Sequence, residues 1–288
     1  LNIYYLTVNY FRYSNFEKSR QLLRRHIIVN GLSMVTLVFR TLDSYVRRHF
    51  RDQRLRQILE YHMVFLVSSP FQAPAIYTLM SHLDFRSGVY YPRRGMMSLV
   101  SDMHALGSDY DITYHTGTAV KTIIIESGAA VGIQLEDGKE VRADIVVSNA
   151  DLEFTETRLL PEKYQSFPAA YWRNRQPGPS ALLVSLGIKG SLPNLLHHNL
   201  YFVDEWRENF RAIYEDNVVP PHASLYVCNP TKTDPSYAPA GQENLFILMP
   251  LPAGVDLDEA ACEQLADTAI ADFARAAGID DLAERIVP

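Results

Sequence analysis

A short stretch of proline, arginine and glycine at residues 92–95 brings together groups that can take part in chemistry. The aromatic and β-branched residues 89–91 before it predict a short strand, and a helical pattern follows it. A turn between a strand and a helix places backbone N–H groups beside a guanidinium. We therefore predict a polar ledge in which Arg93 supplies the charge and Gly95 supplies a turn with positive φ.

The helix that follows this ledge is indicated by apolar residues at helical spacing from Met96 to Leu106. Gly107 is of the type that ends helices. We expect the apolar stripe of this helix to be buried. The turn at residues 92–95 would then face a cavity or solvent.

A second group of arginines precedes a short apolar stretch near the start of the sequence. Arg24 is the second candidate for a functional charge, and it lies with Arg20 and Arg25 directly before residues 27–39. Thirteen residues are too few to cross a bilayer, which needs about 20. Two interpretations remain open: a helix lying in the membrane interface, or a buried helix flanked by solvated surface arginines.

Composition and missing motifs exclude several classes of function. A net charge of −6 argues against a nucleic-acid binder, and 47% hydrophobic with 21% charged residues is typical of a globular chain. Cys228 and Cys262 are far apart in sequence, which indicates neither a disulfide framework nor a cysteine metal site. His49 and His62 lack metal-ligand spacing, so no metal site is predicted. The sequence contains none of the motifs G-x-G-x-x-G, G-x-S-x-G, H-E-x-x-H, Walker A or Cys-x-x-Cys.

The residue pattern predicts a mixture of helices and sheets. Strands are expected at 119–125, 129–135 and 140–147, with hairpin turns at 126–128 and at Asp137-Gly138, where both turn residues should have positive φ. The last of these strands should be buried, and it runs into the small residues Ser148-Asn149-Ala150, which allow a ligand or another backbone to approach closely. A plain three-stranded meander without a ligand is the alternative.

Further strands and helices are expected on both sides of this meander. Asp52 is a candidate N-cap within a helical region at 40–66, and Asp258 and Gly278 should bound an amphipathic helix. Four strands are predicted to form one sheet that covers a cavity, at residues 180–188, 198–203, 223–228 and 244–250.

Three stretches give the sequence a family resemblance. The meander with its turns ESG and EDG and its end ADIVVSNAD, the segment GVYYPRRGMMSLVSDM at 88–103, and the helical segment 51–84 together resemble the bacterial phytoene (carotenoid) desaturases among the flavin-dependent amine-oxidase-like enzymes. The resemblance implies an α+β or α/β chain: a helical and mixed-sheet substrate domain with part of a Rossmann-like, glutathione-reductase-type flavin domain. It implies the ranges 1–110 and 156–288 for substrate regions and 111–155 for the flavin domain.

The resemblance also assigns a cofactor and the residues that hold it. FAD would contact the backbone of Val120 through its adenine, and Asn149 and Ala150 would pass near its ribose and pyrophosphate. The segment containing Arg93 and Gly95 would face the flavin ring and the substrate cavity. The family more often has a second glycine where Arg94 stands, so close approach of a ring at that position is in doubt.

The implied activity is FAD-dependent desaturation of phytoene or a related polyene in carotenoid biosynthesis. The implied location is the cytoplasmic, inner face of the cell membrane, with peripheral attachment. A carotene cis–trans isomerase, another flavin amine-oxidase relative and a cofactor-free binding module for hydrophobic ligands remain alternatives. The sequence begins without methionine and lacks the glycine fingerprint. We therefore expect an internal segment of a longer protein that, by itself, is inactive and does not retain FAD.

Overall fold

The computed structural model describes residues 37–175 and 177–287. The chain divides into two compact units. The first, which we call the sheet unit, comprises Leu1–Ser98 and Gly178–Pro288, and the second, the meander unit, comprises Leu99–Pro177. Both combine helices with antiparallel strands, which confirms the predicted mixture of α and β structure.

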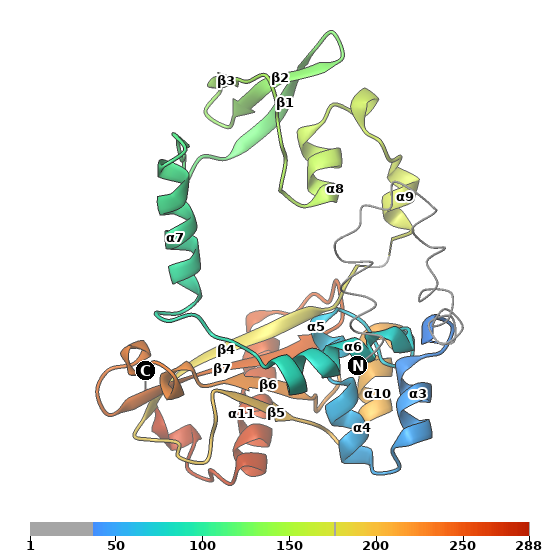
Figure 1. The fold of residues 1–288 in the computed structure, drawn as a ribbon, viewed down its shortest axis with the longest axis vertical. Helices are drawn as coiled ribbons and strands as arrows, with labels where there is room; N and C mark the ends of the chain where they lie inside the picture. The colour runs from blue at the N-terminus through green and yellow to red at the C-terminus, as the bar shows by residue number, and fades with distance from the viewer. Residues whose placement is uncertain (1–36, 176, 288) are drawn as a thin grey trace. The chain divides into compact units, whose positions relative to one another are not determined.

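A five-stranded antiparallel sheet organises the sheet unit (Figure 1). Its strand order is β5-β6-β7-β4-β8, and the two long central strands pair over ten residues, from Ser180 opposite Leu251 to Lys189 opposite Gln242. The four strands predicted in this half of the sequence are confirmed. The five strands of the sheet are β4 Ser180–Lys189, β5 His198–Tyr201, β6 Leu225–Cys228, β7 Gln242–Leu251 and β8 Ile286–Val287.

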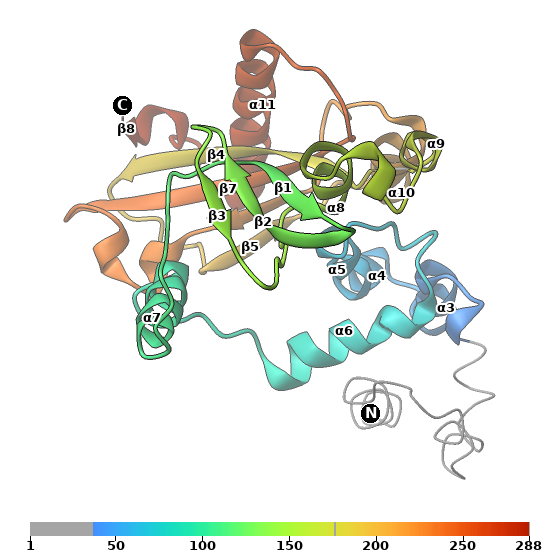
Figure 2. The ribbon, with the colours of Figure 1, turned by 90° about the horizontal axis from the view of Figure 1, so that it is seen from above.

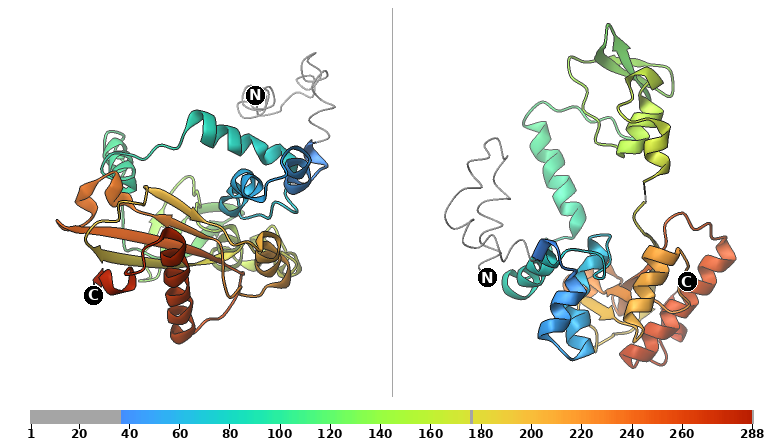
Figure 3. Two further views of the ribbon diagram at one scale, coloured as in Figure 1. Left: turned by 90° about the horizontal axis from the view of Figure 1, so that it is seen from below. Right: turned by 90° about the vertical axis from the view of Figure 1, so that its right-hand side faces the viewer.

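One face of this sheet carries the main hydrophobic core. Alternate residues of β7 are buried, as expected for a strand with one face on a core. Leu245 and Ile247 from this face share a buried cluster with Ile270 and Phe273 of α11 (Glu259–Ala277). Figure 3 shows α11 against the sheet. The predicted ends of α11 are confirmed, because Asp258 caps it and Gly278 follows it with φ 65°.

Several short helices make a second, smaller core in the sheet unit. Thr41 caps α3 and Asp52 caps α4, the latter as predicted. Leu42 of α3 and Met63 of α5 are fully buried in this second core. Figure 2 shows the helices α3, α4 and α5 grouped beyond one end of the strands. Besides α11, the described helices of the unit include α3 Leu42–His49, α4 Gln53–Glu60, α5 His62–Phe65, η3 Ala75–Tyr77, α6 Thr78–His82, η4 Leu83–Ser87, α10 Trp206–Arg211, η7 Ala212–Asp216, η8 Pro230–Lys232, η9 Pro235–Tyr237 and η10 Ala283–Arg285.

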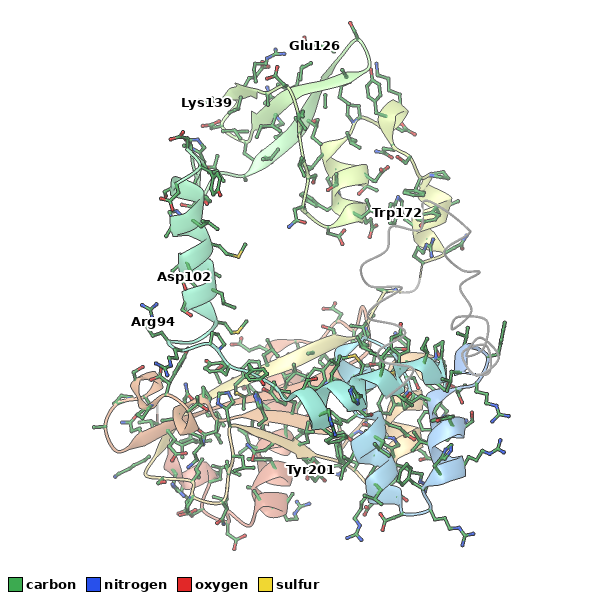
Figure 4. The ribbon with its side chains drawn as sticks, in the orientation of Figure 1. Arg94, Asp102, Glu126, Lys139, Trp172 and Tyr201 are labelled. Atoms are coloured by element: carbon green, nitrogen blue, oxygen red, sulfur yellow. The ribbon has the colours of Figure 1, made fainter. Side chains whose placement is uncertain are left out.

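The meander unit contains the predicted three strands in the order β1-β2-β3. The bounds are β1 Val120–Glu126, β2 Ala129–Leu135 and β3 Glu140–Arg142, and Figure 4 labels Glu126 and Lys139 at the two turns. Positive φ at both turn residues occurs at Ser127-Gly128 (52° and 83°), whereas at Asp137-Gly138 only the glycine has it (88°). The expected geometry of the second turn is therefore wrong. The loop between β2 and β3 is longer than a two-residue hairpin turn. One residue with positive φ, Gly138, is therefore enough to reverse the chain direction.

The remaining elements of the meander unit are short, apart from one helix. The helix α7 (Met96–Ser108) runs along the chain from the sheet unit into the meander unit. The others are α8 Leu152–Phe154, η5 Thr155–Leu159, η6 Glu162–Tyr164 and α9 Ala169–Arg173.

One predicted strand does not form, and another is shorter than predicted. Residues 89–91 are irregular, with Val89 66% and Tyr90 88% exposed, and no described strand pairs with them. The strand expected to reach Val147 stops at Arg142, and Ile145 and Val147 are 79% and 84% exposed rather than buried. A β-rich sequence becomes a strand only when a neighbouring strand accepts its backbone hydrogen bonds, and within the described ranges residues 89–91 and 144–147 have no such neighbour.

The apolar stripe of α7 is also exposed, contrary to the prediction. Met96 is 60% and Met103 72% exposed, with Leu99 and Leu106 close to half exposed. Helical periodicity shows which residues share a face, but it does not supply the surface that covers that face.

No helix among the described residues is long and apolar enough to cross a membrane. Arg20, Arg24 and Arg25 lie outside the described residues, as does most of the apolar stretch 27–39. The two interpretations of that stretch therefore remain predictions.

Candidate functional site

An aromatic cavity of about 270 Å³ lies within the sheet unit, on the strands predicted to cover one. Residues from β4, β5, β6 and β7 form one part of its wall, and helical residues form the rest. The lining includes the aromatic residues Tyr61, Phe65, Phe202, Trp206, Tyr214 and Tyr226, and the aliphatic residues Val64, Val67, Leu200, Leu225 and Leu248.

Three side chains of the aromatic wall have their polar atom bound by a residue outside the lining. Trp206 Nε1 donates to Glu60 Oε2 at 2.9 Å, the Tyr61 hydroxyl donates to Asp84, and the Tyr226 hydroxyl contacts His198 Nδ1 at 2.7 Å. These rings therefore present mainly carbon to the cavity. Such a wall suits an apolar ligand and excludes water.

The residues behind this wall have perturbed pKa values. Burial raises the pKa of Glu60 to about 7, although the hydrogen bond from Trp206 opposes the shift. Burial, and then the hydrogen bond to Asp84, raises the pKa of Tyr61. Burial lowers the pKa of His62 even though Asp84 opposes this, and the His62 Nε2 atom lies 2.9 Å from Asp84 Oδ2. At neutral pH, Tyr61 and His62 therefore add no charge beside the cavity.

A second hollow, of about 600 Å³, lies within the meander unit. Its wall is mostly apolar, with Ile123 and Ile133 from the strands. The three residues that the family resemblance assigns to FAD, Val120, Asn149 and Ala150, all lie in its lining. The structure thus brings these three residues to one place.

The chemistry of this hollow fits the nucleoside end of a flavin cofactor. Residues 144–150 form no backbone–backbone hydrogen bonds with other described residues. Their N–H and C=O groups are therefore available to a polar ligand. Apolar walls with a few backbone donors and acceptors are what an adenosine group needs.

The ledge at residues 92–95 forms a tight turn at the start of α7. Arg94 and Gly95 have φ values of 66° and 80°, which bears out the positive φ expected at Gly95. Ser98 Oγ donates to the Gly95 carbonyl at 2.8 Å, and the Gly95 N–H donates to the Pro92 carbonyl at 3.1 Å. Figure 4 shows the Arg94 side chain directed away from the helix.

Tyrosine side chains occupy the space beside Gly95. A Cβ atom at that position would lie 1.3 Å from Tyr237 Oη, and the Tyr91 hydroxyl donates to Tyr237 Oη at 3.0 Å. Neither Arg93 nor Gly95 lines the aromatic cavity, and Arg93 is exposed. Arg24, the third candidate, lies outside the described residues. The catalytic assignment of these three residues therefore stays a prediction.

Sequence reasoning missed most of the aromatic wall. Tyr226 lies in a predicted strand and Tyr61 in a predicted helical region, so their types and elements were visible. Their convergence was not, because Tyr61 and Trp206 are 145 positions apart and meet only through the packing of the helices on the sheet.

Comparisons with known proteins place the chain in a family. The family described as "Flavin containing amine oxidoreductase" matches residues 34–285. A carotenoid 3,4-desaturase of Haloarcula japonica is 35% identical over 247 residues, covering 86% of this chain and 50% of that protein. A phytoene desaturase of Cercospora nicotianae is 30% identical over 251 residues, covering 86% of this chain and 40% of that protein. The resemblance to carotenoid desaturases is thereby confirmed.

The fold is similar to that of a solved structure. The structure of an oxidoreductase from Methanosarcina mazei superimposes with a TM-score of 0.57 at 18% identity, covering 86% of this chain and 56% of that one. The chain spans about half the length of the curated relatives it matches. Because the family match extends over most of the sequence, the chain belongs to the flavin-containing amine oxidoreductases.

Proposed function

We propose that the protein containing this chain is an FAD-dependent oxidoreductase that desaturates phytoene or a related carotenoid precursor. The observation that carries the proposal is the aromatic cavity of the sheet unit, in which Trp206 and Tyr61 donate their polar hydrogens to residues outside the wall. A hydrocarbon substrate offers nothing to hydrogen bond, so its site has to be apolar. Relatives named as carotenoid desaturases support this substrate class.

The residues of this chain have three roles in the proposal. The aromatic wall that includes Phe202 and Trp206 holds a segment of the polyene and keeps water away from it. Val120, Asn149 and Ala150 hold the adenosine half of FAD, which supplies the hydride acceptor when bound. Arg93 supplies positive charge near the reacting end, with Gly95 shaping the turn. Arg24 is the remaining candidate for such a charge.

The substrate assignment is tested by filling the cavity. The full-length protein is produced in a bacterium that accumulates phytoene, and product is measured per bound FAD. Leu200→Trp places a large side chain in the lining, and Lys189→Trp is the control, because Lys189 is an exposed residue at the other end of β4 and lies outside the lining. We expect Leu200→Trp to reduce product roughly 10- to 100-fold, since displaced substrates react slowly. Lys189→Trp should match wild type.

Three outcomes would count against the proposal. If both variants match wild type, the cavity does not hold the substrate. If the wild-type protein rearranges a carotene without removing hydrogen, it is an isomerase. If it binds phytoene without flavin and releases it unchanged, it is a binding module.

The assignment of Arg93 has a separate test. Arg93→Ala should remove a few kcal/mol of transition-state stabilisation, so turnover should fall. The flavin content should stay unchanged. An exposed arginine that only pairs with a surface carboxylate contributes about 0–1 kcal/mol. Wild-type turnover, or loss of flavin, would show that Arg93 does not act on the reaction.

We also propose that the protein attaches peripherally to the cytoplasmic face of the membrane, from which a hydrocarbon substrate has to be drawn. The basic residues Arg20, Arg24 and Arg25 beside the apolar residues 27–39 support this. Each basic residue near an anionic surface contributes about 1 kcal/mol. Vesicle flotation should therefore show weaker binding when the three arginines are replaced by glutamate. Equal binding would remove the electrostatic part of the proposal.

A further inference from the structure

Two histidines and a cysteine meet at the ends of two neighbouring strands in the sheet unit. His197 and His198 stand at the start of β5, and Cys228 is the last residue of β6. His198 and Cys228 are direct partners in the antiparallel register. One ligand atom from each of the three side chains lies within 4.8 Å of the others. We propose that His197, His198 and Cys228 bind a d¹⁰ transition-metal ion of the zinc class.

The three side chains are the ligand types that such an ion prefers. Imidazole nitrogen and thiolate sulfur suit Zn²⁺, whereas Mg²⁺ and Ca²⁺ require oxygen ligands. Bonds of about 2.0–2.3 Å put tetrahedral ligand atoms roughly 3.5 Å apart, so side-chain movements of about an ångström would close the site. Three protein ligands leave one position for water or another ligand.

The environment of the two imidazoles supports the assignment. His197 Nδ1 contacts Thr233 Oγ1 at 2.5 Å, while the buried His197 Nε2 forms no hydrogen bond with the described residues. A buried polar nitrogen without a partner is costly, and a metal ion would satisfy it. His198 Nδ1 in turn contacts the Tyr226 hydroxyl at 2.7 Å. Hydroxyl partners of this kind orient the rings of metal-binding histidines.

The site adjoins both features already described in the sheet unit. Tyr226 contacts His198 and also lines the aromatic cavity. The Tyr91 ring lies 4.6 Å from the His197 ring, and its hydroxyl bonds Tyr237 beside Gly95. A metal ion at this place would stiffen the junction between the cavity wall and the turn at residues 92–95.

Cobalt provides the test, because Co²⁺ bound to a thiolate gives a sulfur-to-metal charge-transfer absorption in the near ultraviolet. The full-length protein is reduced, stripped with a chelator and titrated with Co²⁺. We expect this band with one ion per chain, and Zn²⁺ should displace it. Cys228→Ser should abolish the band. The matched control is Cys262→Ser, because Cys262 is the other free cysteine and is likewise half-buried.

Two further variants keep the test decisive if Cys228→Ser does not fold. His198→Ala should weaken Co²⁺ and Zn²⁺ binding at least 10-fold. Thr233→Val should weaken it roughly 10- to 100-fold with the band retained, since Thr233 only positions His197. The proposal is overturned if wild type gives no thiolate band, if Cys262→Ser removes it, or if His198→Ala binds both ions as tightly as wild type.

Discussion

Glu60 illustrates at the scale of single residues how burial makes stability depend on pH. Its side chain is fully buried, one oxygen accepts from Trp206, and the other has no hydrogen-bond partner among the described residues. Burial raises its pKa from 4.5 to about 7. The folded protein therefore favours the neutral acid. The contribution of the protonated Glu60 to folding stability is complete below pH 4.5 and is lost as the pH rises through about 7.

Glu60→Gln removes this pH dependence, because an amide does not ionise. A shift from 4.5 to about 7 corresponds to roughly 3 kcal/mol. We expect the variant to be more stable than wild type at pH 8 by up to that amount, with the difference vanishing near pH 4. Urea unfolding of both proteins between pH 4 and pH 8 measures it. A constant difference across this range would show that Glu60 does not titrate with folding.

Replacement of Gly95 should destabilise the protein for two reasons, the backbone conformation and the lack of space for a side chain, and these can be separated. Its φ is 80°, and an added Cβ would lie 1.3 Å from Tyr237 Oη. Gly88 has nearly the same φ, 81°, but nothing lies within 4 Å of its Cβ position. Gly88 has ψ 166°, a conformation essentially restricted to glycine, so Gly88→Ala should cost about 1–3 kcal/mol for the backbone alone. Gly95→Ala should cost at least 1–3 kcal/mol more, since overpacking adds to it.

The measurement for this pair is urea unfolding, followed by fluorescence of the sheet unit. Equal losses in the two alanine variants would mean that Tyr237 moves away freely. Arg94→Gly is a useful third variant, because Arg94 has φ 66° without being glycine. Relief of that backbone strain should leave stability unchanged or raise it by up to about 1 kcal/mol.

At the scale of elements, Glu243 connects the start of strand β7 to two neighbouring segments. Its carboxylate accepts from Asn229 Nδ2 at 2.6 Å, from Lys232 Nζ at 2.9 Å and from Ser191 Oγ at 3.0 Å. Burial by itself would raise the pKa of Glu243, but these bonds outweigh burial and lower it. The stability they give is present above pH 4.5 and is lost as the pH falls through the depressed pKa.

Glu243→Gln should destabilise the sheet unit at neutral pH by about 3–5 kcal/mol, because it leaves Lys232 partly buried without its carboxylate. The loss should shrink below pH 4, where wild type is protonated as well. Lys232→Met in the Glu243→Gln background tests the cause, since it removes the unpaired charge and should recover part of the stability. No recovery would mean that the hydrogen bonds from Asn229 and Ser191 dominate.

The whole molecule has an uneven distribution of buried surface. The sheet unit has a cluster of fully buried residues that includes Ile188, Leu245 and Ile247. The buried apolar residues described in the meander unit are only Ile123, Leu135 and Leu159. Hydrogen exchange should therefore be at least about tenfold slower in β4 and β7 than in β1 and β2, equivalent to about 1.4 kcal/mol. Equal protection would mean that both units open in one cooperative step.

On the proposed function, FAD should change the hydrogen-exchange protection of the full-length protein. A ligand that binds only the folded state adds stability to the parts it contacts. Residues 119–150 should then gain protection, while β4 and β7 should change little. Protection gained only outside residues 119–150 would place the adenosine half of the cofactor elsewhere.

Local patterns in the sequence determined which residues share an element. The strands β4 to β7, the ends of α11 at Asp258 and Gly278, and the N-cap at Asp52 follow from periodicity and capping chemistry, which act over a few residues. The family also follows from local segments. Val120, Asn149 and Ala150 were identified by position along a familiar pattern, and the fold brings them around one hollow.

Only the tertiary structure decided what each apolar surface meets. Ile145 and Val147 have strand-forming types, and α7 has a helical stripe, yet these side chains are exposed because no described element covers them. The aromatic cavity and the trio of His197, His198 and Cys228 depend on strand register and on contacts between distant residues. Register depends on the pairing of whole strands, and a shift of one residue would turn His198 away from Cys228. Spacing along the chain therefore could not reveal that site.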